Sequence, residues 1–243
     1  RKSGHKTLVD HFAYPALGCG LVYERMASAI RNSGGNIFLN TPVTLASKHN
    51  DTQGIELILP DGTPRTYDHY ISSMPLTLLV KQLNPPPNVA NAASHLRFRN
   101  TILVYLEITG ANPFPDQWIY VHATELNTGR ISNFRNWVPS INRGLPSAIL
   151  CLEYWCYDAD AIWQEADEVL IQQAQTELLS TGLVTGDAIQ RGHVVRLHRS
   201  YPVYDRGYKT AVETVSEYLK TFTNLQAIGR YGAFKYNNQD HSI

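Results

Sequence analysis

The sequence predicts a mixed protein, between the α/β and α+β classes, built from two modules that each combine a β-sheet with helices. Three observations support this class. Of the 243 residues, 43% are apolar, as in an ordinary globular protein. Segments with apolar side chains at helical spacing occur among short segments rich in β-branched and aromatic residues. Finally, a run of three prolines within residues 84–88 separates two regions of different pattern.

The first module is predicted to cover residues 1–83. Residues 21–32 carry apolar side chains three and four positions apart and are followed by two glycines, which is typical of an amphipathic helix that ends there. Two strands should follow, at 36–40 and 43–49. A hairpin is then predicted around the turn Asp61-Gly62. Its two strands are expected at 54–60 and 66–73.

The second module is predicted to cover residues 84–204, because successive prolines fit neither a helix nor a sheet interior and so indicate a domain crossing. Four strands should form an antiparallel sheet, at 100–108, 116–122, 130–137 and 147–156. One helix follows them, residues 161–180, with an apolar side chain at about every fourth position. Residues 192–205 are then expected as an extended strand that runs into a turn.

Residues 205–243 form the last predicted segment. A helix is expected at 208–223, followed by a strand, a glycine turn and the approach to a final helix. The chain has no initiator methionine, and it stops inside the dense polar string YNNQDHSI. We therefore expect an interior piece of a longer chain, whose missing N-terminal part would be its partner.

Composition argues against several classes of protein. Lys+Arg and Asp+Glu both number 21, so no basic field would attract nucleic acid, and we expect no such partner. No run approaches the roughly 18 apolar residues of a membrane span, and the first residues lack the apolar core of a signal peptide. Cys19, Cys151 and Cys156 have neither disulfide-framework nor metal spacing, so we expect no metal and a cytoplasmic location.

Known catalytic motifs give little guidance. The sequence contains no P-loop, no H-E-x-x-H and no G-x-S-x-G. Gly18-Cys19-Gly20 is similar to the start of a dinucleotide fingerprint, but Tyr23 occupies the position of the third glycine. Alone, these residues indicate only a tight turn before a helix.

Four segments, taken in order, carry more information. They are FAYPALGCGLVYERMASAIRNSGGNIFLNTPV (12–43), YDHYISSMPL (67–76), LHRSYPVYD (197–205) and GRYGAFKYNNQDHSI (229–243). Together they resemble the flavin amine oxidase and protoporphyrinogen oxidase superfamily, which includes UDP-galactopyranose mutases. The string Asn-Gln-Asp-His-Ser is the most family-like feature, and it is closest to the mutase-like branch.

The resemblance implies FAD as the cofactor and a fragment of a two-domain FAD-dependent oxidoreductase fold. Residues 1–83 would be part of the FAD-binding domain, 84–204 the substrate-binding domain with a mixed or antiparallel sheet, and 205–243 a return to the FAD-binding domain. The implied reaction is hydride transfer between a small organic substrate and flavin N5, without an obligatory acid or base residue. Two alternatives stay open: a mutase-like isomerase acting on a sugar nucleotide, and a non-catalytic binding module.

The resemblance also implies cofactor contacts. The loop of Gly18, Cys19 and Gly20 would pass over the flavin ring, and the backbone of Val43 would meet the adenine. The glycine-arginine turn would approach the diphosphate, and the polar tail would offer helix N-terminal amides to the negative charge near flavin N1 and O2, with Asn238 or Asp240 as the cap. On composition alone, this tail is a polar surface turn. The turn and tail residues are Gly229, Arg230, Asn238, Gln239, Asp240, His241 and Ser242.

Candidate substrate contacts come from the second module, which resembles a roof over the flavin. A charged side chain at the start of an apolar strand needs a partner or a ligand, and tyrosine rings suit stacking on a sugar. The alternative for each is ordinary pairing or core packing. The candidates are Arg99, Asn133, Trp137, Tyr201 and Tyr204.

Overall fold

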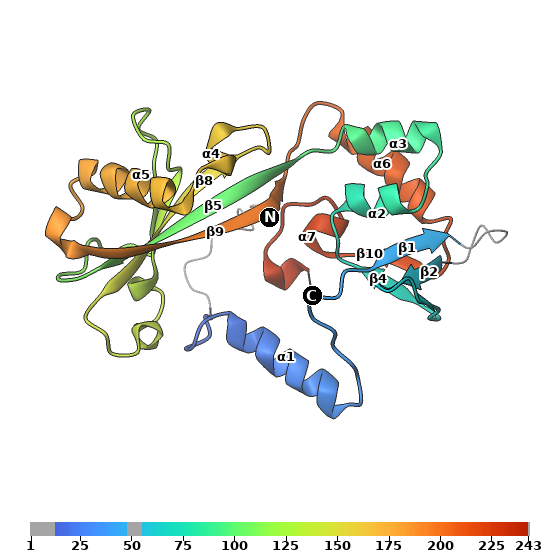
Figure 1. Cartoon of the computed structure of the whole chain (residues 1–243), viewed down its shortest axis with the longest axis horizontal. Helices are drawn as coiled ribbons and strands as arrows, with labels where there is room; N and C mark the ends of the chain where they lie inside the picture. Colours follow the sequence, from blue (N-terminus) through green and yellow to red (C-terminus); the bar gives the residue numbers. More distant parts are fainter. Residues whose placement is uncertain (1–12, 48–54, 243) are drawn as a thin grey trace, which may run out of the picture. The chain divides into compact units, whose positions relative to one another are not determined.

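The computed structural model of the chain describes residues 13–47 and 55–242 (Figure 1). They form two compact units. The first, here the sheet unit, holds described residues up to 37 together with 102–155 and 159–196; the second, the mixed unit, holds 38–101, 156–158 and the chain from 197 onward. The assignment of residues 1–83, 84–204 and 205–243 to cofactor and substrate domains stays a prediction.

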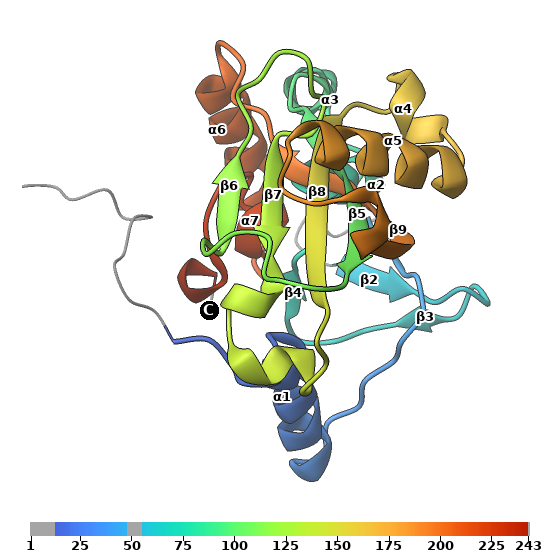
Figure 2. The ribbon, with the colours of Figure 1, turned by 90° about the vertical axis from the view of Figure 1, so that its left-hand side faces the viewer.

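The sheet unit is built around a five-stranded sheet in the order β6-β7-β8-β5-β9 (Figure 2). The antiparallel pairing expected for this region is confirmed for β6 with β7 and for β7 with β8, where Arg130 lies opposite Glu153. The predicted strand 130–137 is shorter, since it ends at Asn133 and continues as η1 (Phe134–Asn136). The strands are β5 (Phe98–Ile108), β6 (Trp118–Tyr120), β7 (Arg130–Asn133), β8 (Ala148–Cys156) and β9 (Ile189–Pro202).

Helices lie along one side of this sheet (Figures 1 and 2). The single helix expected at 161–180 is wrong: α4 (Ala161–Gln164) and α5 (Asp167–Ser180) are separated by Glu165 and Ala166, which are extended, with ψ of 150° and 152°. The guanidinium of Arg196 donates to the Glu165 carbonyl and to the Asp167 carboxylate. It therefore binds both sides of the break and compensates for the lost helical hydrogen bonding.

The buried part of α5 includes a carboxylate. Glu177 is only 7% exposed, and its two oxygens accept hydrogen bonds from the Thr128 amide at 3.0 Å, the Tyr154 hydroxyl at 3.3 Å, Gln173 at 2.9 Å and Asn127 at 3.3 Å. Four donors replace the water that the carboxylate lost on burial. Gln173 belongs to α5 itself, whereas Tyr154 of β8 and Asn127 and Thr128, which precede β7, attach α5 to the sheet.

The helix predicted at 21–32 is confirmed as α1 (Gly20–Asn32), which has no buried residue. The strand predicted at 36–40 is wrong. That segment is irregular, Asn40 has a φ of 55°, and Phe38 and Leu39 are 76% and 74% exposed. Because this apolar pair has no neighbouring strand among the described residues, apolar alternation alone does not produce a strand here.

The mixed unit contains two small sheets. β1 (Thr44–Ser47), β2 (Ile55–Ile58) and β3 (Pro64–Arg65) are antiparallel, and the turn at Asp61-Gly62 connects the last two as predicted. The predicted second hairpin strand, 66–73, is corrected. β4 (Tyr70–Ser72) belongs instead to a parallel pair with β10 (Leu225–Ala227).

Helices α2 (Leu76–Gln82), α3 (Pro87–Ser94) and α6 (Tyr208–Leu219) complete the mixed unit. The proline run does not exclude a helix, because Pro87 is the first residue of α3, where its missing N–H costs no hydrogen bond. The helix expected at 208–223 ends at Leu219. The apolar core comprises Leu45, Ile55, Tyr70, Leu76, Leu79, Val80, Leu83, Val89, Ala93, Leu96, Val215, Leu219, Phe222 and Phe234.

Short helical turns connect or follow these elements. They are η2 (Pro139–Asn142), η3 (Gly186–Ala188), α7 (Gly229–Gly232) and η4 (Gln239–His241). The predicted glycine turn is followed in the described chain by α7 and η4, and the final helix that they would approach stays a prediction. Among residues 13–47 and 55–242, no helix combines the length and the apolar character needed to cross a membrane.

Candidate functional site

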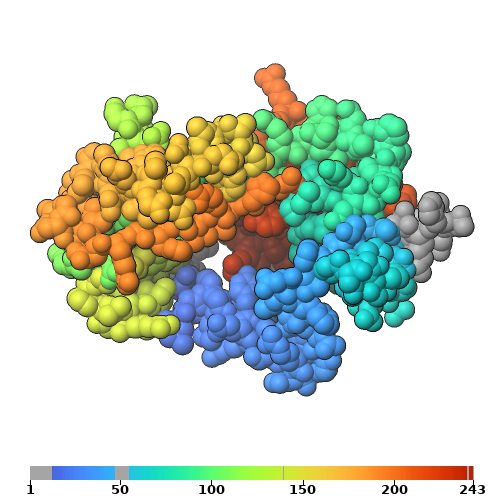
Figure 3. Space-filling model, viewed as in Figure 1, coloured from blue at the N-terminus to red at the C-terminus, as the bar shows by residue number. Residues whose placement is uncertain are grey.

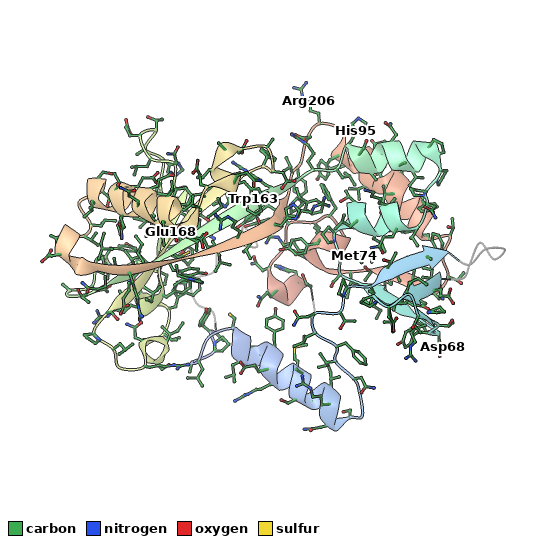
Figure 4. All side chains as sticks on the ribbon, in the orientation of Figure 1. Asp68, Met74, His95, Trp163, Glu168 and Arg206 are labelled. Atoms are coloured by element: carbon green, nitrogen blue, oxygen red, sulfur yellow. The ribbon has the colours of Figure 1, made fainter. Side chains whose placement is uncertain are left out.

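The carboxyl ends of the parallel strands β4 and β10 form the centre of the candidate site. The amide of Ile228, just after β10, donates to the Ser72 carbonyl at 2.9 Å and so brings α7 against the turn that follows β4. Met74, labelled in Figure 4, lies in that turn. In sheets with parallel strands, ligands bind at the carboxyl ends.

Two glycines permit this arrangement. Gly229 has a φ of 76°, in the left-handed region that side chains disfavour. A Cβ atom at Gly232 would lie 3.0 Å from the Ser72 carbonyl oxygen and 3.5 Å from that of Met74. The backbone of α7 therefore approaches the β4 turn so closely that a side chain at position 232 would force the neighbouring backbone to move.

Arg230 follows Gly229, and its guanidinium contacts two aromatic rings. The Cζ atom is 4.4 Å from the ring centre of Tyr201 and 4.5 Å from that of Tyr236, within the range of cation–π attraction. Nη1 donates to the Asn237 carbonyl at 3.2 Å. Nε is buried and has no hydrogen-bond partner among the described residues, and the same holds for Oδ1 of Asn237.

An unsatisfied buried donor and a nearby unsatisfied acceptor are unfavourable in a folded protein unless a ligand or water satisfies them. The Arg230 donor can bind an anionic or carbonyl oxygen, and the Asn237 acceptor can bind an N–H or O–H group. This pair therefore fits a polar ligand.

The two predicted tyrosines lie in the same cluster. Tyr201 stacks on Tyr236 with ring centres 5.8 Å apart, and the Tyr204 hydroxyl accepts a hydrogen bond from the Tyr236 amide at 2.6 Å. Tyr204 also stacks on Tyr208 at 4.4 Å. We call Tyr201, Arg230 and Tyr236 the arginine-tyrosine cluster. Sequence reasoning identified Tyr201 and Arg230 but missed Tyr236, although it stands one residue before the polar string NNQDHS.

The polar tail follows this cluster. Asn238 precedes η4, and its backbone amide lies 3.4 Å from Nδ1 of His241, while the Ser242 amide donates to the Gln239 carbonyl at 2.9 Å. The side chains of Asn238, Gln239 and His241 are exposed and that of Ser242 is half-buried. The side chain of Asp240 lies outside the described part of the structure. Cofactor contact by these residues stays a prediction.

Two predicted residues of the mixed unit lie in other surroundings. Val43 is half-buried immediately before β1, so its contact with adenine stays a prediction. Arg99 is exposed, and its guanidinium lies 5.8 Å from the ring centre of Tyr157, which Arg97 also contacts at 5.3 Å. The structure thus associates Arg99 with Tyr157, and a role toward the substrate stays a prediction.

The loop of Gly18, Cys19 and Gly20 belongs to the sheet unit. Gly18 has a φ of 89°, and its amide closes a turn onto the Pro15 carbonyl at 2.9 Å. A Cβ atom on Gly20 would meet no described atom within 4 Å, so the described chain itself does not require glycine there. Burial, with a hydrogen bond to Cys19 as a smaller contribution, raises the pKa of Tyr14 to about 12.

The remaining two predicted residues are also in the sheet unit. Asn133 is fully buried, its amide nitrogen donates to Asn112 at 2.8 Å, and its side-chain oxygen accepts from the Arg135 amide at 3.2 Å. Its contact with the substrate stays a prediction. Trp137 stacks on Trp118 with ring centres 5.5 Å apart and contacts Tyr14 at 5.0 Å. These rings form an aromatic surface of which Trp118 was not anticipated.

Other ionisable side chains of the sheet unit are held in structural contacts. Arg130 donates two hydrogen bonds of 2.7 Å to Glu153, whose side chain is 7% exposed. Burial, followed by the charge of Glu153, raises the pKa of the Cys151 thiol, which therefore stays protonated and unreactive. Within the described ranges, no group of three or more His, Cys, Asp or Glu side chains is arranged to hold a metal ion.

Comparison with known proteins identifies the family. The family described as flavin containing amine oxidoreductase matches residues 8–216, most of the chain. The chain belongs to this family. A search of curated protein sequences finds no match.

Solved structures agree with this family at the level of the fold. Reduced UDP-galactopyranose mutase matches with a TM-score of 0.78 and 18% identity over 93% of this chain and 49% of the mutase. A protein from Exiguobacterium assigned as a protoporphyrinogen oxidase matches with a TM-score of 0.72 and 18% identity, over 89% of this chain and 47% of that protein. A triple mutant of putrescine oxidase matches with a TM-score of 0.51 and 17% identity, over 73% and 38%. The chain spans about half the length of the first two structures.

The family and the mutase match indicate FAD as the cofactor. The described residues fit this group. Gly229 permits close backbone approach, and the unsatisfied Nε of Arg230 can donate to an oxygen of the diphosphate or of the flavin ring. The predicted fold, that of FAD-dependent oxidoreductase domains with both parallel and antiparallel sheets, is confirmed.

Proposed function

We propose that this chain is part of an FAD-dependent oxidoreductase in which a hydride passes between a small organic substrate and flavin N5. The observation that supports it most directly is the buried Nε donor of Arg230, which has no partner in the described chain. It lies just after the carboxyl end of β10, in a chain of the flavin containing amine oxidoreductase family. When bound, FAD would supply the hydride-accepting position.

The residues of this chain bind and orient the reacting groups. Arg230 supplies positive charge and a hydrogen-bond donor. The rings of Tyr201 and Tyr236 hold the plane of its guanidinium, so that little side-chain entropy is lost when a ligand binds. Gly229 lets the backbone approach the ligand.

The test uses the full-length protein. Purified protein should be yellow, with flavin absorbance bands, and its affinity for FAD should fall about tenfold to a hundredfold in Arg230→Ala, because a charge-assisted hydrogen bond is removed. Arg206→Ala is the matched control, since Arg206 is an exposed arginine of the same unit (Figure 4). Colourless protein that takes up no added FAD, or equal FAD affinity in wild type and Arg230→Ala, would refute the proposal.

A second candidate is a mutase-like isomerase of a sugar nucleotide. The observation that favours it is the arginine-tyrosine cluster, because an arginine beside stacked tyrosines suits a diphosphate joined to a sugar. The reduced full-length protein is incubated with UDP-galactopyranose. Ring contraction without net oxidation selects the isomerase. Its absence, together with reduction of bound FAD by an organic electron donor, selects the oxidoreductase, and failure of both reactions selects a non-catalytic binding module.

A further inference from the structure

A groove of about 550 Å³ opens between α2 and α3, and all of its lining residues belong to the mixed unit. The surfaces of the two helices adjoin in Figure 3, where α2 is teal and α3 is green. The lining residues relevant here are Thr77, Lys81, Asn84, Ala90, Ser94 and Arg199.

The polar lining of this groove has one sign of charge. Lys81 and Arg199 are cations, Thr77 and Ser94 carry hydroxyl groups, and no lining residue carries a carboxylate. Two cations around a concave surface raise the local concentration of anions. The groove therefore favours an anionic occupant.

Small side chains keep the groove open. Ala90 lines it from α3, and Ala93 lies one turn further along the same helix. Larger residues at these positions would fill the space beside Lys81. The volume exceeds the roughly 30 Å³ of a single water molecule many times, so it admits an organic group together with the anion.

Arg199 is held by an unusual backbone. Its φ is 57°, which is uncommon for a residue other than glycine and often marks a functional position. The Arg199 amide donates to Oδ1 of Asn100 at 2.8 Å, and the Asn100 amide nitrogen donates to Asp158 at 2.8 Å. The charge of Arg199 contributes to lowering the pKa of Asp158, and Asp158 also forms a hydrogen bond of 3.0 Å with Nε2 of His198.

The guanidinium of Arg199 keeps most of its hydrogen-bonding capacity. Nη1 donates to Oγ1 of Thr77 at 3.0 Å, and this is its one side-chain hydrogen bond in the described chain. A guanidinium has five N–H donors in a fixed plane, suited to two oxygens of one anion. Thr77 also lines the groove, so this contact holds the guanidinium at the lining.

We propose that the groove between α2 and α3 binds a small phosphate monoester, with Arg199 holding the phosphate oxygens, Lys81 adding charge and the organic part lying over Ala90. The lining shares no residue with the arginine-tyrosine cluster. A phosphate dianion fits better than a single carboxylate, because it presents three oxygens to two separate cations.

The experiment is calorimetric titration of the full-length, FAD-loaded protein with inorganic phosphate and with glycerol 3-phosphate at constant ionic strength. We expect both probes to bind, glycerol 3-phosphate more tightly. Asn tolerates a positive φ, so Arg199→Asn removes the guanidinium without demanding a new backbone, and it should weaken both probes about tenfold or more. Lys81→Gln should weaken both by a smaller factor.

Ala90→Leu separates the two parts of the site. It fills the groove without changing charge and should weaken glycerol 3-phosphate more than inorganic phosphate. Lys220→Gln is the matched control, because Lys220 is an exposed lysine outside the groove, paired with Glu217. Its affinities should equal those of the wild type.

Bound FAD in the variants, measured by absorbance, reports folding and the state of the cofactor site independently of phosphate binding. A negative phosphate result therefore leaves the proposed function standing. Absence of binding by either probe, or equal affinities in wild type, Arg199→Asn and Lys81→Gln, would overturn the proposal. Binding of inorganic phosphate alone, unaffected by Ala90→Leu, would overturn the organic monoester as the ligand.

Discussion

Replacement of Gly232 by alanine tests whether α7 packs against the β4 turn as closely as described. The added Cβ atom would meet the Ser72 carbonyl oxygen at 3.0 Å, the Met74 carbonyl oxygen at 3.5 Å and the Ala227 carbonyl carbon at 3.6 Å. All three neighbours are backbone atoms. No flexible side chain can move aside, so α7 itself must shift.

Two opposing effects decide the size of the change. Alanine is a better helix former than glycine by about 0.5–1 kcal/mol, which would stabilise α7. Insertion of a methyl group into tightly packed structure costs about 1–3 kcal/mol. The steric cost exceeds the helical gain, so we expect Gly232→Ala to lower the free energy of unfolding by about 1–2 kcal/mol.

Thermal unfolding of the full-length protein measures this change. A loss of about 1–2 kcal/mol corresponds to a fall in Tm of roughly 2–8 °C. FAD affinity should fall as well, because the shift of α7 moves Gly229 and Arg230. Gly186→Ala is the control, since a Cβ atom there meets only the end of the Leu179 side chain, at 4.0 Å, and both the Tm and the FAD affinity should stay unchanged. An unchanged Tm in Gly232→Ala would refute the close packing of α7 on β4.

Three other variants test separate features. Gly20→Ala should also weaken FAD binding in an absorbance titration if the loop passes over the flavin; equal affinity would remove the loop from the cofactor site. Glu177→Leu should cost about 3 kcal/mol in urea unfolding, because buried donors lose their acceptor, whereas Glu177→Gln should cost about 1 kcal/mol; equal costs would contradict the proposed hydrogen bonding. The hydrogen bond from Asn100, and to a smaller extent His198, lowers the pKa of Asp158 in the folded protein. The ionised carboxylate therefore stabilises the fold above the unfolded-state pKa of about 4. This contribution is lost as the pH falls through the lower pKa of the folded state. Asp158→Asn should therefore flatten the stability curve below about pH 4, and a curve identical to that of the wild type would exclude this role.

Local patterns predicted part of the fold well. The helix at α1 and the long strands β5 and β8 carry apolar residues with a clear period, which a short window of sequence reveals. The break between α4 and α5 was not foreseeable in this way. It depends on Arg196, which lies far from Glu165 in sequence and binds its carbonyl oxygen only in the folded chain.

The candidate site was partly foreseeable for a different reason. Gly229, Arg230, Tyr201 and Tyr204 stand in strings that resemble a known family, and the structure brings the two tyrosines and the arginine together. The burial of Asn133 was not foreseeable, because it follows from cross-chain hydrogen bonds to partners that no periodicity identifies. Nor does sequence reveal which donor of an arginine lacks a partner.

The register of β4 with β10 has a consequence for the order in which the molecule acquires its structure. Tyr70 pairs with Leu225, so the intervening chain must close into a long loop before this pair forms. The entropy lost in closing this loop slows folding. On the ribosome, β4 emerges long before its neighbour is synthesised and must wait with an open edge, exposed to wrong pairing and to chaperones. The arginine-tyrosine cluster can thus form only after translation has passed Tyr236.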